Sequence, residues 1–278
     1  MLNNGAMNRQ ELRDSIVRLG PWHHDVEVAP GVRTGEPAPP GTYPQELGAP
    51  TLIQPERILS WLVGELYPAG LGGRSVLDCA CNAGGYLFAA ARLGAGRCFG
   101  FDVREHWIEQ ARFLAEQLPS EEIEFAALDL AALPSLNLAP FDVTLFNGIL
   151  YHLPDPVAGL RVAADHTKEL LVVNTSICPR NYEGLMLSVE STTDVMSGVH
   201  RLAWLPTGYG VLQTVLEWCG FPHTRLRFDV EGQVKGWRRI EVLAARDEKT
   251  FAHYDAHHAR HQQPAGRAGW LRRLLRRG

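Results

Sequence analysis

Short apolar runs alternate along the 278-residue chain with longer segments in which apolar residues recur every three or four positions. The short runs predict buried strands, and the recurring positions predict amphipathic helices. We expect strands at residues 75–79, 98–101, 123–127, 141–146, 169–174, 225–228 and 240–245, the last two as antiparallel neighbours. We expect helices at residues 8–19, 55–67, 86–93, 105–117, 157–164 and 209–219. This alternation predicts an α/β fold with a doubly wound, mostly parallel seven-stranded sheet that has helices on both faces.

The same pattern divides the chain into three parts. Residues 1–70 form N-terminal helices and an arm, residues 71–248 form the sheet domain with an insert at 176–206, and residues 249–278 form a His/Arg-rich tail. The arm, 22–50, is rich in proline and glycine but contains Trp22, His23 and His24. Because long irregular segments in compact proteins often serve as lids, we expect the arm to cover a pocket and exclude water from it.

Composition adds little to this picture except at the C-terminus. The chain is 45% hydrophobic and 21% charged with a net charge of −4, which is ordinary for a globular protein and gives no general attraction to nucleic acid. Its five cysteines lie mostly in apolar runs, so we expect buried reduced thiols. No apolar run is long enough to cross a membrane and the N-terminus lacks the apolar core of a signal peptide, so we expect a cytoplasmic protein.

The tail carries two further patterns. Its histidines, at positions 253, 257, 258 and 261, are typical of a solvated stretch, and we expect no metal site. As a helix, residues 267–277 would place apolar residues opposite arginines. Such a face suits weak contact with a partner protein or with the anionic inner surface of the membrane. We favour the alternative that the tail is solvated.

Candidate chemistry lies where the predicted parallel strands end, because ligands of doubly wound sheets bind beyond the carboxyl ends of the strands. The turn at residues 80–84 has too few glycines for a pyrophosphate, and the acid before it, Asp78, would repel phosphate but accept hydrogen bonds from an ammonium group. A nucleoside that carries an amino acid, S-adenosylmethionine, fits this turn, whereas the alternative is an ordinary strand-helix crossover. Asp102 would accept from the ribose hydroxyls and Asp129 from the adenine amino group. The predicted cofactor-binding residues are Asp78, Ala80, Asn82, Gly84, Asp102, Asp129, Leu130 and Asn147.

Three stretches, 76–84, 100–102 and 141–153, resemble class I S-adenosylmethionine-dependent methyltransferases. Within them, Gly148-Ile149-Leu150-Tyr151-His152 is similar to the Gly-Val-Leu-Tyr-His of the branch that contains the tRNA wobble-uridine 5-oxyacetate (carboxymethyl) transferase and its uncharacterised relatives. Leu19-Gly20-Pro21-Trp22 and Cys219-Gly220-Phe221 also resemble that branch. The resemblance implies a Rossmann-like methyltransferase fold, S-adenosylmethionine as cofactor and S-adenosylhomocysteine as product. It also implies that Tyr151 lies next to the transferred group and that Arg239, or Arg238 beside it, reaches the same pocket.

One departure from the branch bears on the substrate. The lysine that holds the extra carboxylate of carboxy-S-adenosylmethionine in the tRNA enzyme is Leu19 here, and leucine cannot pair with a carboxylate. We therefore expect ordinary S-adenosylmethionine. The main body also lacks the basic excess needed to bind tRNA phosphates, so a nucleic acid is a disfavoured partner.

We accordingly expect methylation of a hydroxyl on a small molecule or glycan. The predicted catalytic residues are Tyr151, His152 and His24, and the predicted substrate-binding residues are Trp22, His23 and Arg239. The base that removes the hydroxyl proton is sought among His23, His24 and His152, although His152 could instead cap the following loop. The insert adds polar groups that could face a substrate, among them Glu183 and Glu190. Two alternatives stay open: tRNA wobble-uridine modification with carboxy-S-adenosylmethionine, and a non-catalytic cofactor-binding module of the same fold.

Overall fold

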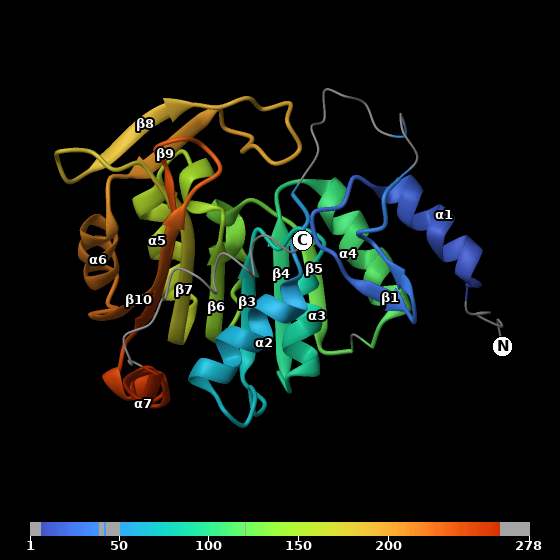
Figure 1. Cartoon of the computed structure of the whole chain (residues 1–278), viewed down its shortest axis with the longest axis horizontal. Helices are drawn as coiled ribbons and strands as arrows, with labels where there is room; N and C mark the ends of the chain where they lie inside the picture. The colour runs from blue at the N-terminus through green and yellow to red at the C-terminus, as the bar shows by residue number, and fades with distance from the viewer. Residues whose placement is uncertain (1–6, 39–41, 43–50, 120, 262–278) are drawn as a thin grey trace.

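A computed structural model describes residues 7–38, 42, 51–119 and 121–261 of the chain. Its centre is a seven-stranded sheet with the strand order β10-β11-β7-β6-β3-β4-β5 (Figure 1). The strands are β3 (Ser75–Cys79), β4 (Arg97–Asp102), β5 (Ile123–Ala127), β6 (Phe141–Asn147), β7 (Thr167–Ile177), β10 (His223–Glu231) and β11 (Arg238–Ala245). Neighbouring strands from β5 to β7 pair in parallel, and β11 pairs antiparallel with both β7 and β10. The predicted doubly wound, mostly parallel sheet is confirmed.

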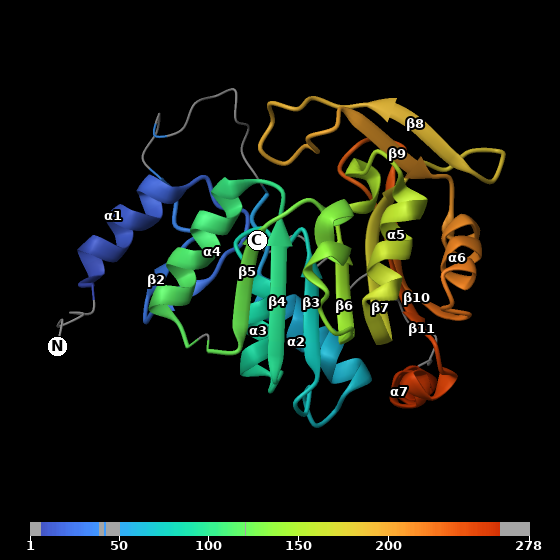
Figure 2. The same cartoon turned by 180° about the vertical axis from the view of Figure 1, so that it is seen from behind.

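Helices cover both faces of this sheet, because successive residues of each buried strand point to opposite sides. Val76 and Cys98 pack into one apolar core, whereas Leu77 and Phe99 pack into the other. The first core is covered by α1 (Arg9–Leu19), α2 (Pro55–Leu66), α3 (Gly85–Arg92) and α4 (Glu105–Gln117). The second is covered by α5 (Pro156–Asp165), α6 (Tyr209–Trp218) and the short 3-10 helices η2 (Leu130–Leu136) and η3 (Leu150–His152). Figure 1 looks onto the face with α2 and α3, and Figure 2 onto the face with α5 and α6.

Three smaller elements complete the chain. The arm forms a short hairpin of β1 (Glu27–Ala29) and β2 (Val32–Arg33). The insert forms a second hairpin, β8 (Leu185–Val189) and β9 (Leu202–Pro206), which lies above the sheet in Figure 1 at the end where the parallel strands finish. After β11, η4 (Glu248–Phe251) leads into α7 (Ala252–His261) at the opposite end of the sheet.

The structure also bears on the expectations about membranes and cysteines. All five cysteines are free and buried. Among the helices that the structure describes, none is both long and apolar enough to cross a bilayer. The predicted basic helix at 267–277 lies outside the described residues.

Candidate active site

The turn after β3 has three residues in left-handed backbone conformations. Ala80 and Asn82 adopt left-handed conformations with φ of 59° and 51°, and Gly84 does so with φ of 73° at the N-terminus of α3. A Cβ on Gly84 would lie 2.5 Å from the ring of Phe125, so only glycine fits there. The Asn82 side chain accepts a hydrogen bond from the Ala83 amide at 2.8 Å. The turn is thereby held open at the end of the sheet, where a nucleoside would bind.

Two carboxyl groups face this turn from neighbouring strands. Asp102 accepts hydrogen bonds from the amides of Asn82 at 3.1 Å and Arg104 at 3.0 Å. Asp78 is 1% exposed, and its Oδ2 is buried without a hydrogen-bond partner within the described residues. Burial raises the pKa of Asp102 to about 6, and burial together with the nearby charge of Asp102 raises the pKa of Asp78 well above its usual range. A cationic group bound beside them would therefore stabilise their charged forms.

The next strand ends carry the other predicted cofactor-binding residues. Asn147, at the end of β6, also has a buried side-chain oxygen, Oδ1, without a hydrogen-bond partner in the described part of the chain. Leu130 is 4% exposed and packs into the second core. Asp129 caps η2 through the Ala131 amide at 2.8 Å and also lies 3.2 Å from Nε2 of His200 in the insert. The structure therefore brings Asp78, Asp102 and Asn147 to one edge, with Asp129 at its margin.

A chain of polar contacts links η3, β7 and β11 beside this edge. Arg239 donates from Nη1 to the Tyr151 hydroxyl at 3.0 Å and from Nε to Asn174 Oδ1. Asn174 in turn donates to Glu241 at 2.8 Å. The guanidinium of Arg239 is thus fixed against Tyr151, and the two residues that the family resemblance placed in one pocket are in contact.

His152 contacts the insert rather than the sheet. Its Nδ1 lies 2.7 Å from Oε2 of Glu190, which follows β8, and the two side chains are 19% and 14% exposed. The amide of Gly198 approaches the same nitrogen at 3.0 Å. The sequence named Glu190 only as a polar group of the insert, because 38 residues separate it from His152 and no local pattern connects them.

The arm places its three predicted site residues differently. Trp22 is 5% exposed, donates from its indole to the Ile16 carbonyl at 2.8 Å and packs against Phe113, which makes it a core residue. His24 is also buried, and its Nδ1 accepts a hydrogen bond from the Gly85 amide at 3.1 Å. This cap satisfies one of the free amides at the start of α3. These placements argue against the substrate role expected for Trp22 and the catalytic role expected for His24.

His23 is partly buried beside His24, and the centres of the two rings are 5.3 Å apart. Burial lowers its pKa to about 4, and the positive charge of Arg239 contributes in the same direction. Its Nδ1 is buried without a hydrogen-bond partner among the described residues. The substrate-binding role expected for His23 stays a prediction.

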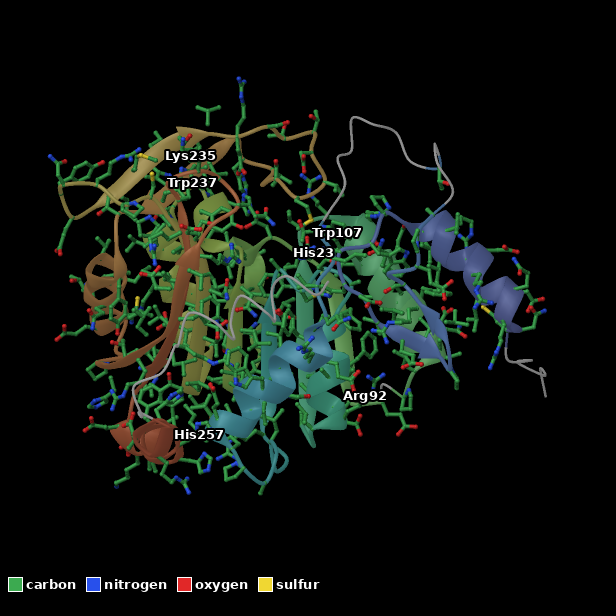
Figure 3. The ribbon with its side chains drawn as sticks, in the orientation of Figure 1. His23, Arg92, Trp107, Lys235, Trp237 and His257 are labelled. Carbon is green, nitrogen blue, oxygen red and sulfur yellow. The ribbon has the colours of Figure 1, made fainter. Side chains whose placement is uncertain are left out.

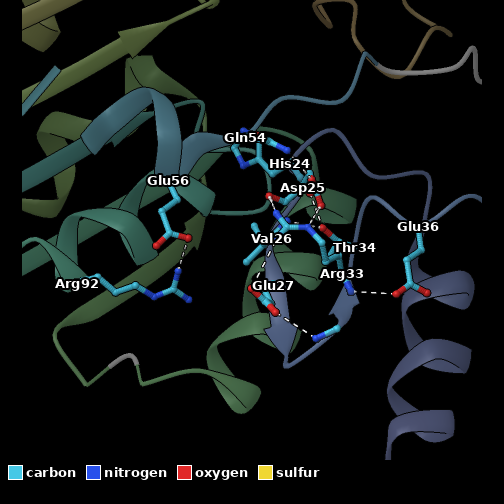
Figure 4. A network of polar contacts seen from close by, with 11 residues as sticks. His24, Asp25, Val26, Glu27, Arg33, Thr34, Glu36, Gln54, Glu56 and Arg92 are labelled. Atoms are coloured by element: carbon cyan, nitrogen blue, oxygen red, sulfur yellow. Dashed lines mark hydrogen bonds and ion pairs between the residues drawn. The ribbon is translucent and has the colours of Figure 1, made fainter. Parts of the chain in front are cut away.

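A network of polar contacts holds the arm against α2 and α3 (Figure 4). Asp25 binds Arg33 at 2.9 Å and accepts from Gln54 at 3.2 Å. The Thr34 hydroxyl donates to the His24 carbonyl at 2.5 Å and accepts from the Val26 amide at 2.9 Å. These bonds join the part of the arm that carries His23 and His24 to the start of α2, and its role as a cover of the pocket stays a prediction.

The insert is fastened over the same edge of the sheet. Arg104, two residues after Asp102, donates from Nη2 to the carbonyl groups of Ser197 at 2.8 Å and Asp194 at 3.2 Å. With the contacts of Glu190 and His200 already described, the insert is joined to the ends of β4, β5 and β6.

Comparison with known proteins agrees with this architecture. Residues 72–200 match the sequence family described as a methyltransferase domain. Over 91 residues the chain is 40% identical to a tRNA U34 carboxymethyltransferase of Campylobacter hominis, covering 33% of this chain and 31% of that protein. Over 144 residues it is 29% identical to a ubiquinone biosynthesis O-methyltransferase of Idiomarina loihiensis, covering 52% of this chain and 56% of that protein. The chain thus spans between about a third and just over half the length of these relatives.

A solved structure resembles most of the chain. It is the N-terminal domain of EvdMO1 in the presence of SAH and D-fucose, with a TM-score of 0.67 and 20% identity, covering 87% of this chain and 99% of that one. This likeness supports the fold, and the match at 72–200 covers the turn, the strand ends and the Tyr151-His152 pair. Over residues 72–200 the chain is therefore similar to a methyltransferase domain, and its sheet has the fold of the class I S-adenosylmethionine-dependent methyltransferases.

Proposed function

We propose that this chain transfers a methyl group from S-adenosylmethionine to a hydroxyl group of a small molecule or glycan. The observation that carries the proposal is the contact of 2.7 Å between His152 and Glu190, beside Tyr151 and Arg239. Two comparisons support it: one relative is named as an O-methyltransferase, and the structural neighbour was solved with SAH and a sugar.

The polar groups at the strand ends fit this cofactor. Asp78 and Asn147 each present a buried oxygen that lacks a hydrogen-bond partner within the described residues, and such atoms normally find one. We assign Asp78 to the ammonium group and Asp102 to the ribose hydroxyls. Asn147 ends β6, four residues before Tyr151, and we assign it to the amino-acid portion of the cofactor. When bound, the cofactor supplies an electrophilic methyl group on a sulfonium.

A hydroxyl acceptor needs a base, and the contacts of the three histidines select one. His24 uses Nδ1 as a helix cap, and burial lowers its pKa well below the usual range. Burial likewise lowers the pKa of His23 to about 4, which makes it a weak base. His152 alone among the three has a carboxylate on Nδ1, which places the proton on that nitrogen and leaves the lone pair on Nε2. We therefore assign His152 as the general base and Glu190 as the residue that orients it.

The Gly198 amide sharpens this assignment, because it approaches the same Nδ1. One nitrogen cannot both donate to Glu190 and accept from Gly198. The carboxylate contact is shorter, 2.7 Å against 3.0 Å, and a charged acceptor forms the stronger hydrogen bond. Replacement of Glu190 by glutamine would remove this preference and favour the tautomer that cannot act as a base at Nε2.

The test begins with the cofactor. Isothermal titration should show binding of S-adenosylmethionine to the full chain, and formation of S-adenosylhomocysteine should then be followed with a panel of sugars, phenols and unmodified tRNA. With the accepted substrate, Glu190→Gln should lower kcat by about 10²- to 10⁴-fold, the usual contribution of a general base, while cofactor affinity stays unchanged. Glu217→Gln, at an exposed position of α6, is the control and should retain activity.

Three results would count against the proposal. Absence of cofactor binding would overturn the cofactor assignment, and binding without turnover on any acceptor would favour a non-catalytic module. Full activity of Glu190→Gln would exclude the role given to His152.

A second candidate, tRNA wobble-uridine carboxymethylation, is supported by the 40% identical relative and by the cationic Arg239 next to Tyr151. Leu19 is partly buried and packs against the first core, and it offers no charge to an extra carboxylate. Mass spectrometry of the ligand that copurifies with the protein separates the two candidates, because carboxy-S-adenosylmethionine is heavier by one carboxyl group.

A further inference from the structure

Three side chains that can bind metal ions meet far from the candidate active site. Glu65 lies in the last turn of α2, and His257 and His258 lie on α7. One possible ligand atom of each lies within 4.8 Å of the other two. Figure 3 shows His257 on α7 at the bottom of the molecule, away from His23 at the edge where the cofactor would bind.

The two helices present these groups in a fixed arrangement. The ring of His253, one turn before His257, lies with Nδ1 2.9 Å from the Glu65 carbonyl oxygen, which anchors α7 on the end of α2. Glu65 is 3% exposed, and its Oε1 lies 3.8 Å from Nε2 of His258. The imidazole rings of His257 and His258 are 5.3 Å apart. The carboxylate therefore faces α7 with one of its two oxygens.

The other oxygen belongs to a buried charge network. Arg227 binds Oε2 of Glu65 at 2.6 Å and also binds Glu241, and the three side chains are only 2% to 4% exposed. Two carboxylates thus share one guanidinium in a region without solvent. Because a buried negative charge without a partner costs several kcal/mol, a cation on the α7 side of Glu65 would balance the network.

We propose that Glu65, His257 and His258 bind a divalent transition-metal ion of the zinc class. Two imidazole nitrogens and one carboxylate oxygen are a ligand set that Zn²⁺ prefers, with water as the fourth ligand. Ligand atoms about 2.1 Å from one ion lie at most about 4 Å apart, so the imidazoles move inward by less than about 1 Å on binding. The ion would fasten α7 to α2 and would take no part in methyl transfer.

The test uses the full chain without an affinity tag, stripped with a chelator and titrated with ZnCl₂ in a chelator-buffered solution. The wild type should bind one Zn²⁺ per chain, and its melting temperature should rise with Zn²⁺. His257→Ala/His258→Ala should weaken binding by about 100-fold or more. His223→Ala, a histidine of β10 outside the cluster, should bind like the wild type. His253→Ala should loosen α7, seen as a lower melting temperature without metal, yet still bind Zn²⁺.

Two outcomes would overturn the proposal. They are a wild type that binds no stoichiometric Zn²⁺, and a double variant that binds as tightly as the wild type. Far-UV circular dichroism checks the fold of each variant, and the single variant His258→Gln, which keeps a polar side chain, gives the same test if the double variant unfolds.

Discussion

Replacement of Arg227 by methionine should be among the most destabilising single changes in this chain. The side chain lies at 3.9 Å from the centre of the Trp61 ring and binds two carboxylates that are themselves 4% exposed. Methionine fills similar space beside Trp61 but removes the charge, and with it the cation–π contact. Two buried carboxylates are then left without their partner.

The magnitude follows from two independent arguments. Charges about 4 Å apart at an effective dielectric constant of about 20 attract by ~4 kcal/mol per pair. A carboxyl with an ordinary pKa of about 4.3 can escape by protonation at pH 7 at a cost of ~3.7 kcal/mol, which sets a ceiling for each group. The variant no longer buries a guanidinium, so the desolvation cost of that group disappears and offsets part of the destabilisation. We expect Arg227→Met to lower the free energy of unfolding by ~3–5 kcal/mol at pH 7, the usual cost of breaking a buried pair.

The assay is equilibrium urea denaturation in the presence of a chelator, followed by circular dichroism at pH 7 and pH 5. Because the protonation ceiling falls to ~1 kcal/mol per carboxyl at pH 5, the difference between Arg227→Met and the wild type should shrink by at least ~1 kcal/mol. Arg225→Met is the matched control on the same strand. Its side chain is 27% exposed and pairs with the more exposed Asp255 and Glu248, so it should cost less than ~1 kcal/mol. A loss below 1 kcal/mol in Arg227→Met, or an equal loss at both pH values, would refute the reasoning.

Three further outcomes can be measured. Gly84→Ala should lower the free energy of unfolding by ~2–3 kcal/mol through its φ of 73° and the clash with Phe125, whereas Gly31→Ala, with φ of 70° and open space around it, should show only the ~1 kcal/mol of backbone strain. The pKa of His23 is lowered to about 4 in the folded chain, so as the pH falls His23 is protonated in the unfolded chain first. This difference should lower the free energy of unfolding by ~2 kcal/mol from pH 7 to pH 5. In urea denaturation, His23→Gln should remove that part of the decrease. Burial raises the pKa of Asp102 to about 6, so the affinity for S-adenosylmethionine, measured by calorimetry, should weaken by about tenfold from pH 7 to pH 5. The variant Asp102→Asn should bind the cofactor weakly at both pH values. An affinity of the wild type that does not depend on pH would contradict the assigned role.

The sheet could be predicted because its information is local. Strands such as β3, whose residues are all buried, are short and largely apolar runs in the sequence. The rule that ligands bind beyond the carboxyl ends of parallel strands then predicted from the sequence that Asp78 and Asp102 lie close together. The β8–β9 hairpin was not predicted. Leu187 and Val189 on β8 are 50% and 69% exposed, so this strand lacks the buried face that produces a recognisable alternation.

The roles of individual side chains depended on contacts that sequence spacing does not reveal. His24 caps a helix that begins 61 residues later, whereas Nδ1 of its neighbour His23 has no hydrogen-bond partner among the described residues, so two adjacent histidines differ in their contacts. The tail histidines were expected to be solvated, but His253 and His257 are half-buried against α2. In each case the partner lies on a distant element, and only the tertiary fold determines which side chain it meets.

The attachment of the insert through Arg104 has a consequence for the order of events in turnover. Arg104 follows the proposed ribose acceptor Asp102 by two residues and holds the backbone of the insert, which also supplies Glu190. We expect the insert to lift when a nucleoside enters or leaves this edge, and that movement would withdraw the carboxylate from His152. The cycle should therefore be compulsory-ordered, with the nucleoside first on and last off. Steady-state kinetics would then show competitive inhibition by S-adenosylhomocysteine against S-adenosylmethionine and mixed inhibition against the acceptor.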